Sequence, residues 1–156
     1  MSTTRQTLAS EFLATLEIEL LESFHLGHTP FGSRRIDVFR GGCLKGPRIE
    51  AKILNGGSDA LLRRSDGAIQ PDVRLTVETG DGALIYVTYR AVRRGPPDIM
   101  AALDRGENPS PTSYYLRSVP FFETGAEDYA WLNQIVAVGV GRREPQRAIY
   151  DIFQIG

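Results

Sequence analysis

Residues 72–92 read DVRLTVETGDGALIYVTYRAV, and this stretch decides the fold class. From Val73 to Val77, apolar residues alternate with polar ones, which places the apolar side chains on one face of a β-strand. Asp81-Gly82 then supplies two residues that tolerate the positive φ of a tight hairpin turn. Beyond the turn, bulky side chains occupy both faces, as in a strand that is covered on each side. The stretch therefore predicts an antiparallel hairpin.

Similar signals recur along the chain. Asn55-Gly56-Gly57 and Asp66-Gly67 are further turn signals flanked by apolar runs, whereas Gly27 to Gly32 indicates a loop. Short helices are expected at residues 96–106, where proline opens and glycine closes the segment, and at 126–132. The remaining strands are expected at residues 12–20, 34–39, 48–54, 113–122, 133–141 and 148–155.

These elements predict an all-β protein, a small and mostly antiparallel β-barrel of about eight to nine strands with one or two short helical segments. Strands of about ten residues are longer than usual and suit a barrel that encloses one small ligand. A β-sandwich is the alternative architecture. The length of 156 residues matches a single domain spanning residues 1–156.

Composition excludes several classes of function. The formal net charge is −1, which gives no basic surface for nucleic acid. No run approaches the roughly 20 apolar residues of a membrane helix, and the N-terminus lacks a signal-peptide pattern, so a cytoplasmic protein without a membrane partner is expected. The lone Cys43 cannot form an internal disulfide.

Neither a metal nor a cofactor is expected. His25 and His28 lie in a Gly/Pro segment without a third ligand at metal-binding spacing. Residues 139–144 (GVGRRE) begin like a dinucleotide fingerprint, but the third glycine is missing and a strand follows in place of a helix.

Polar residues at strand positions are the candidate site. A barrel interior could gather them, and buried charges must be paired, so such clusters often mark binding sites. Asp72 and Glu123 are the candidate catalytic acid/base groups, because a carboxylate with a raised pKa can move a proton. The alternative is that Arg48, Asp72 and Arg117 form salt bridges at the barrel rim or in a dimer interface. The candidate ligand-binding residues are Arg48, Asp59, Tyr86, Arg117, Trp131 and Asn133.

Several blocks resemble the domain-of-unknown-function 3237 family, also called uncharacterised protein family 0311. The resemblance implies a small β-barrel that commonly pairs into homodimers, and it implies no activity and no catalytic residues. The family's usual Ala-Asp-Trp is replaced by Ser58-Asp59-Ala60, which predicts a larger or differently shaped pocket. The matching blocks are residues 27–35 (GHTPFGSRR), 41–48 (GGCLKGPR), 56–59 (GGSD), 81–87 (DGALIYV), and 122–125 (FETG) with 129–133 (YAWLN).

Three functions remain open. The first is a small-molecule-binding barrel that holds a carboxylate or phenolic oxygen through Arg48 or Arg117 near Trp131. The second is a cofactor-free isomerase, cyclase or lyase, in which Arg48 or Tyr86 stabilises an oxyanion. The third is a dimeric scaffold without a ligand, held by apolar outer faces such as Ile85, Val87, Val136 and Val138. A raised carboxylate pKa beside a cavity would favour the enzyme, and a filled interior would favour the scaffold.

Overall fold

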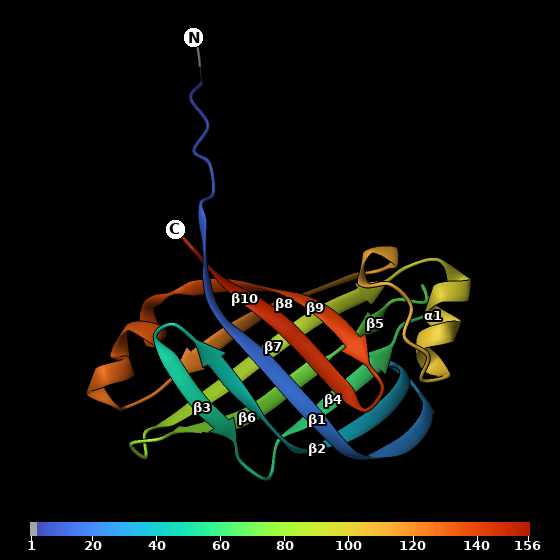
Figure 1. Cartoon of the computed structure of the whole chain (residues 1–156). Helices are drawn as coiled ribbons and strands as arrows, with labels where there is room; N and C mark the ends of the chain where they lie inside the picture. Colours follow the sequence, from blue (N-terminus) through green and yellow to red (C-terminus); the bar gives the residue numbers. More distant parts are fainter. Residues whose placement is uncertain (1–2) are drawn as a thin grey trace.

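A computed structural model describes residues 3–156, which fold into strands with a helix at either end (Figure 1). The strands are β1 (Ser10–Thr29), β2 (Gly32–Gly46), β3 (Ile49–Ile53), β4 (Ser58–Arg63), β5 (Ile69–Gln70), β6 (Asp72–Thr79), β7 (Leu84–Arg94), β8 (Tyr115–Glu123), β9 (Val136–Glu144) and β10 (Arg147–Ile155). The helices are α1 (Pro97–Asp104) and the 3-10 helices η1 (Pro111–Ser113) and η2 (Glu127–Gln134).

The strands close into an antiparallel barrel. Their order is β1-β10-β9-β8-β7-β5-β4-β2-β3-β6, and additional pairings join β1 to β2, β7 to β6 and β4 to β6. Closure satisfies the backbone groups that an open sheet edge would expose. The barrel prediction is confirmed, but the described residues form ten strands where eight to nine were expected. The two strands that were not expected are the short ones, β4 with six residues and β5 with only two.

One predicted loop is wrong. The segment from Gly27 to Gly32 was expected to be a loop, yet β1 runs to Thr29 and only Pro30 and Phe31 form the turn. The Thr29 hydroxyl donates to the Gly32 carbonyl at 2.8 Å and accepts from the Phe31 N–H at 3.2 Å. Gly27 and Gly32 have φ of 81° and 133°, so glycine here fits a tight hairpin and not only a loop.

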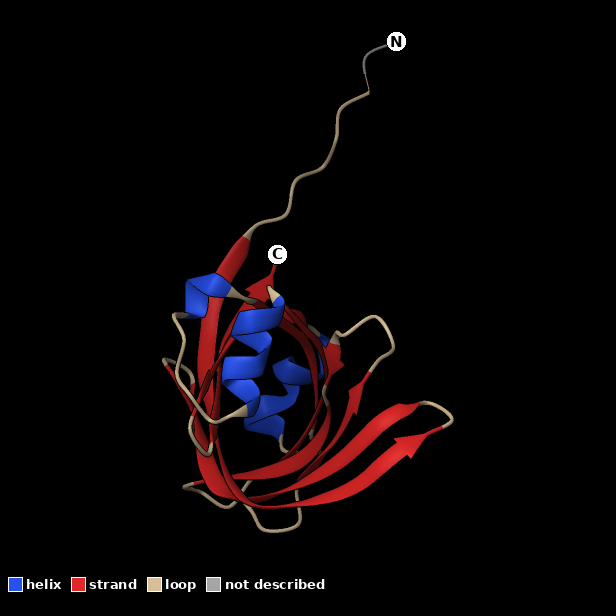
Figure 2. Ribbon diagram, turned by 90° about the vertical axis from the view of Figure 1, so that its right-hand side faces the viewer, coloured by secondary structure: helices blue, strands red, loops and turns tan. Residues whose placement is uncertain are grey.

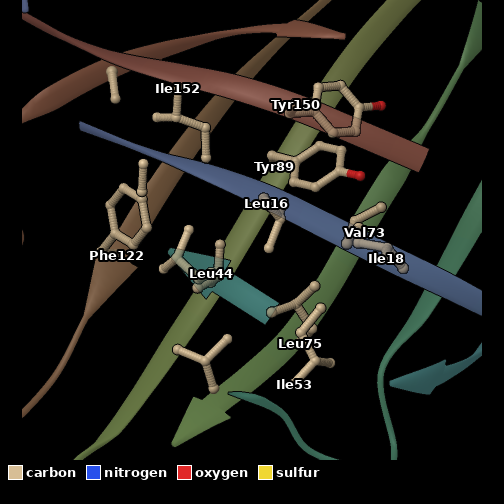
Figure 3. Packing of buried hydrophobic residues seen from close by; sticks show 14 of the residues in the cluster. Leu16, Ile18, Leu44, Ile53, Val73, Leu75, Tyr89, Phe122, Tyr150 and Ile152 are labelled. Carbon is tan, nitrogen blue, oxygen red and sulfur yellow. The ribbon is translucent and has the colours of Figure 1, made fainter. Parts of the chain in front are cut away.

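The middle of the barrel is packed with hydrocarbon. Inward side chains such as Leu16 and Leu75 are at most 2% exposed and meet across the interior (Figure 3). Ile85 and Val87 belong to this core at 0% exposure, so their assignment to an apolar outer face was wrong. Strand alternation explains the correction, because Leu84 and Tyr86 hold the outward positions of β7.

Short helices lie at the two ends of the barrel. The predicted helix at 96–106 is α1, with Pro97 in its first turn, and Figure 2 shows it lying across one opening. The predicted segment at 126–132 is η2, and its Leu132 is 1% exposed in the core. The two barrel ends are therefore covered differently.

Replacement of Leu75 by alanine should lower the free energy of unfolding by about 2–5 kcal/mol, because a buried side chain leaves a cavity. Leu84→Ala is the matched control on the next strand, since Leu84 is 52% exposed, and it should cost less than about 0.5 kcal/mol. Urea unfolding measures both variants. Equal losses in the two would contradict the assignment of inward and outward faces.

Candidate functional site

Beneath α1 the inward-facing residues change from apolar to polar. On β7, the inward series Ile85, Val87 and Tyr89 continues to Arg93, which is 5% exposed. On β2, Phe39 is followed toward the same end by Asp37, which is fully buried. We call this cluster the polar mouth; it consists of Arg35, Asp37, Asp59, Tyr89, Arg93, Arg143 and Tyr150.

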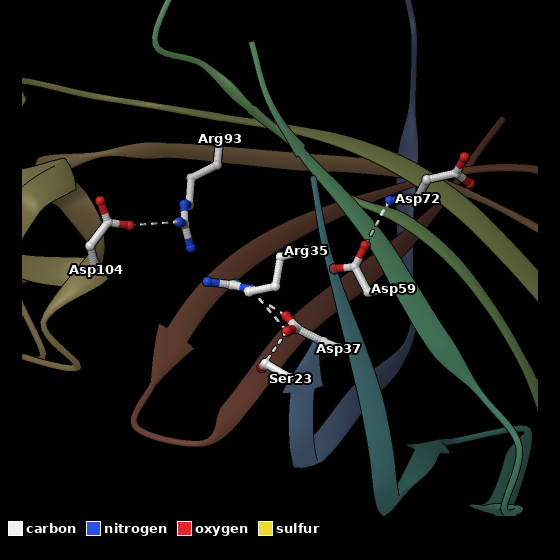
Figure 4. A network of polar contacts seen from close by, with 7 residues as sticks. All are labelled: Ser23, Arg35, Asp37, Asp59, Asp72, Arg93 and Asp104. Carbon is white, nitrogen blue, oxygen red and sulfur yellow. Dashed lines mark hydrogen bonds and ion pairs between the residues drawn. The ribbon is translucent and has the colours of Figure 1, made fainter. Parts of the chain in front are cut away.

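Asp37 is a buried carboxylate of the polar mouth whose oxygens both have partners. Its Oδ1 lies 2.9 Å from Nε of Arg35, and its Oδ2 accepts from Nη2 of Arg35 at 3.1 Å (Figure 4). Ser23 Oγ donates to the same carboxylate at 2.6 Å. A buried carboxylate needs partners of this kind to stay ionised. Asp37 and Arg35 therefore neutralise each other.

Asp59 lies directly opposite Asp37 in the β2–β4 register and is 6% exposed. Its Oδ1 accepts the backbone N–H of Asp72 at 2.9 Å. Burial raises the pKa of Asp59 from 3.8 to about 6; the hydrogen bond from Asp72 opposes this shift, and the charge of Asp37 adds to it. Asp59 is thus a carboxyl group that changes its charge near neutral pH.

Two buried tyrosines lie beside Asp59. The rings of Tyr89 and Tyr150 are 4.9 Å apart, and their hydroxyls point the same way (Figure 3). Burial raises the pKa of Tyr150 to about 12 and that of Tyr89 well above its usual range, so both stay protonated and can donate hydrogen bonds. Gly141 makes room for one ring, since a Cβ there would lie 2.6 Å from Tyr150 Cε1.

Arginines close the polar mouth on the α1 side. Burial lowers the pKa of Arg93 to about 10, and the nearby charge of Arg143 adds to this effect. Asp104 at the end of α1 binds Arg63 at 2.6 Å, whereas its other oxygen lies 4.0 Å from Arg93 Nη2. The Arg143 backbone is fixed by its N–H, which donates to the Tyr114 hydroxyl at 2.8 Å.

Two spaces adjoin the polar mouth. An inner void of about 10 Å³, roughly the room of one water molecule, touches Asp59, both tyrosines and two arginines. An outer cleft of about 170 Å³ opens above it. Leu20, Arg93 and Arg143 line both spaces. A small molecule in the cleft would therefore be separated from Asp59 mainly by these side chains.

Of the predicted site residues, the structure places Asp59 in the polar mouth. Asp72 contributes its backbone N–H there, while its half-buried side chain points away (Figure 4). Arg117 is on the outer face, with its guanidinium 4.9 Å above the Tyr115 ring. Tyr86 is 37% exposed and pairs with the exposed Glu123. These side chains do not meet Asp59.

The other predicted residues gather near η2. The Arg48 guanidinium stacks 3.6 Å from the centre of the Trp131 ring. Asn133 accepts from the Thr124 N–H at 2.8 Å and donates to the Thr124 carbonyl at 2.9 Å. The stack fixes η2 against the β2–β3 turn, and the hydrogen bonds of Asn133 fix it to the segment after β8. The ligand-binding role of these residues stays a prediction.

Sequence reasoning missed most of the polar mouth. Arg93 follows the inward positions of Tyr89 and Ala91, and Arg143 follows the inward Gly141. Tyr150 lies between the buried Ala148 and Ile152. In each case, a polar residue continues or interrupts an apolar series on the same strand face. That signal was present in the sequence but requires knowing which face points inward.

Within residues 3–156, no three His, Cys, Asp or Glu side chains form a group able to hold a metal ion. In the same range, no helix has both the length and the apolar character needed to cross a membrane.

The fold and the site define a closed antiparallel β-barrel with a buried, charged mouth at one end. Residues 8–155 match the family model described as "Protein of unknown function (DUF3237)", and the chain belongs to this family. The chain is 34% identical over 149 residues to the UPF0311 protein RPA1785 of Rhodopseudomonas palustris, covering 96% of this chain and 97% of that protein. The predicted family resemblance is confirmed.

Solved structures share the barrel. The crystal structure of RPA1785 aligns with a TM-score of 0.94 at 33% identity, over 97% of this chain and 100% of that one. A beta-barrel like protein from Acinetobacter baumannii gives a TM-score of 0.85 at 34% identity, over 99% and 100% of the two chains. An enzyme from Penicillium herquei shares the fold, with a TM-score of 0.74 at 22% identity over 100% of both chains.

A more distant sequence relative carries a functional name. The hydroalkoxylation enzyme phnH of Penicillium herquei is 26% identical over 110 residues, which cover 68% of this chain and 56% of that protein.

Asp59→Asn should make the protein more stable at about pH 8, by an amount on the order of 3 kcal/mol. Because burial raises its pKa, folded Asp59 binds a proton more tightly than the unfolded chain does. The stability contributed by neutral Asp59 is present at about pH 4 and is lost as the pH rises through about 6. Asparagine stays neutral and can still accept the Asp72 N–H. Urea unfolding at both pH values measures the difference.

The exposed Asp128→Asn in η2 is the control for removing a carboxylate, and it should show no comparable gain. A stability difference between wild type and Asp59→Asn that does not grow from about pH 4 to pH 8 would contradict the raised pKa.

Proposed function

We propose that this protein is a cofactor-free acid/base enzyme that acts on a small organic molecule at the polar mouth. The single observation that carries the proposal is Asp59, a buried carboxyl with a pKa raised to about 6 that adjoins a void whose wall is shared with a cleft. A general acid or base works best when its pKa lies near the operating pH. This is also the feature by which the sequence hypotheses distinguish an enzyme from a binder.

The neighbours of Asp59 complement proton transfer. Tyr89 and Tyr150 stay protonated and can donate hydrogen bonds to an oxygen atom in the void. Arg93 and Arg143 supply positive charge on the cleft side. Fixed donors and charges of this kind stabilise negative charge that develops on a carbonyl, enol or phenol oxygen. Asp59 would move the proton while these groups hold the oxyanion.

The reaction class is isomerisation, cyclisation or elimination, because these reactions move protons without net oxidation or reduction. The name of the distant relative phnH supports this class. Hydroalkoxylation adds an O–H bond across a C=C bond, so one proton leaves oxygen and one is delivered to carbon. A carboxyl group that is half-protonated near pH 6 can perform both transfers.

The two other hypotheses fit the polar mouth less well. A dimeric scaffold requires no ionisable group in the interior, although the middle of the barrel is filled as that hypothesis expects. A pure binder is compatible with the buried Arg93, but it does not require a carboxyl that titrates near neutral pH. We therefore keep ligand binding as the first step of the proposed reaction.

In D₂O, the wild-type protein should catalyse deuterium incorporation into at least one member of a panel of pyruvate, phenylpyruvate and ortho-allylphenol. Asp59→Asn should slow this exchange by about 100-fold or more, the usual contribution of a general acid or base. Proton NMR of the substrate measures the exchange, and ligand-observed NMR measures binding in parallel. Asp128→Asn, whose side chain is exposed in η2, is the matched control.

Binding without exchange in the wild type would reduce the protein to a binder. Exchange that survives in Asp59→Asn and is lost in Asp72→Asn would return the acid/base role to the residue predicted from sequence. Circular dichroism of each variant shows whether it is folded, so a loss of exchange through unfolding can be recognised.

The homodimer and the cytoplasmic location stay predictions, and we propose the outer face of β8 and β9 as the contact with a second copy. Phe121 and Val136 are each 53% exposed there, and Val119 is 46% exposed. Val136 pairs with the half-buried Ile155 of β10, so the apolar surface continues onto the next strand. Exposed apolar surface of this kind often marks a protein contact, and a symmetric dimer would use the same face twice.

Phe121→Asp should convert a dimer into a monomer, because a charge would be buried in the apolar contact. Phe31→Asp is the control, since Phe31 is 76% exposed in the β1–β2 turn, away from this face. Sedimentation velocity distinguishes the species. A wild type that is monomeric at all concentrations, or a Phe121→Asp variant that stays dimeric, would contradict this surface.

A further inference from the structure

Arg93 is an incompletely satisfied buried cation. Its side chain is 6% exposed, and its nearest recorded carboxylate oxygen, in Asp104, is 4.0 Å from Nη2. Its Nε is buried without a hydrogen-bond partner among residues 3–156. A buried donor normally has a partner, because leaving it unpaired costs free energy. Arg93 is therefore a side chain that a ligand could satisfy.

The carboxylates around Arg93 are engaged elsewhere. Asp37 is held by Arg35 and Ser23, and Asp104 lies closer to Arg63, at 2.6 Å. Within the described residues, Arg143 takes part in no ion pair. Two guanidinium groups at the boundary between the cleft and the void thus lack a close carboxylate partner.

We infer that Arg93, with Arg143 beside it, is the seat for the anionic group of the substrate, and that this group is a carboxylate. The inference rests on the proposed function, because it names the class of molecule on which Asp59 acts. Both arginines line the cleft and the void, so a carboxylate held between them would keep its attached carbon atoms next to the groups of the polar mouth. The planar fork of a guanidinium matches a carboxylate in shape and charge.

The charge of the cleft favours an anionic ligand. Its walls carry Arg35, Arg93 and Arg143, but also Asp104, Glu107 and Glu144. Arg35 is already neutralised by Asp37. Each of the three carboxylates is paired with an arginine outside the cleft: Asp104 with Arg63, Glu107 with Arg105 and Glu144 with Arg147. Arg93 and Arg143 are therefore the cations of the cleft that an anionic ligand would neutralise. The small volume of about 170 Å³ also limits the ligand to a compact molecule.

Benzoate tests the seat, with benzamide as its neutral counterpart of the same shape. In the wild type, benzoate should bind and shift the Arg93 Nε–Hε signal in ¹⁵N NMR spectra, whereas benzamide should not. Arg93→Gln should weaken benzoate binding at least tenfold. Arg64→Gln is the matched control, since Arg64 pairs with Asp66 and does not line the cleft, and it should bind benzoate as the wild type does.

Several outcomes would overturn the inference: equal affinity for benzamide, an unmoved Arg93 signal, or unchanged binding in Arg93→Gln. Full displacement of benzoate by equimolar inorganic phosphate or chloride would also overturn it, because the site would then be a general anion site. If Arg93→Gln does not fold, the wild-type Nε–Hε signal decides alone. Benzoate binding that persists in Asp59→Asn would support the carboxylate seat even if deuterium exchange is absent. A failure of the seat can therefore be distinguished from a failure of the proposed function.

Discussion

The cost of burying charge inside a closed barrel shapes this molecule. Asp37 and Asp59 face each other across neighbouring strands, and only Asp37 has a guanidinium partner within ion-pair distance. Two adjacent buried carboxylates cannot both ionise cheaply, so the less well-paired one holds its proton to a higher pH. The reactive character of Asp59 is thus a consequence of where Arg35 and Ser23 direct their hydrogen bonds.

The rest of the barrel supports this arrangement. Aliphatic side chains fill the middle and keep solvent from the β1 and β6 side of the cluster, with Leu16 and Leu75 at its centre. Glycine at position 141 lets the Tyr150 ring lie close to β9. The end of the barrel near η2 is fixed by Leu132 and by the stacking of Arg48 on Trp131. The buried charged side chains Asp37, Asp59 and Arg93 lie together in the polar mouth at the α1 end.

The sequence was sufficient for the fold because alternation and turn chemistry are local. The DVRLTVETGDG stretch is observed as β6, its turn and the start of β7, and both helical segments occur where they were expected. It was not sufficient for the site, because a strand's alternation does not reveal which of its faces points inward. Asp59 is buried, whereas Tyr86 and Arg117 carry their polar groups on outward strand faces. Asp37 and Arg93 escaped notice because their neighbours on β4 and α1 are distant in the chain.

The shortness of β5 leaves one seam of the barrel wall with little backbone pairing. This strand contributes only Ile69 and Gln70, and it is joined to β7 through a single registered pair, Ile69 with Arg93. Hydrogen bonds at such a seam open more readily than those of the long strands, and local breathing concentrates there. Asp104 of α1 pairs with Arg63 on β4 and lies 4.0 Å from Arg93 on β7, so α1 ties together the strands on either side of this seam. The side chains of α1 thus supplement the barrel wall at the place where its backbone pairing is shortest.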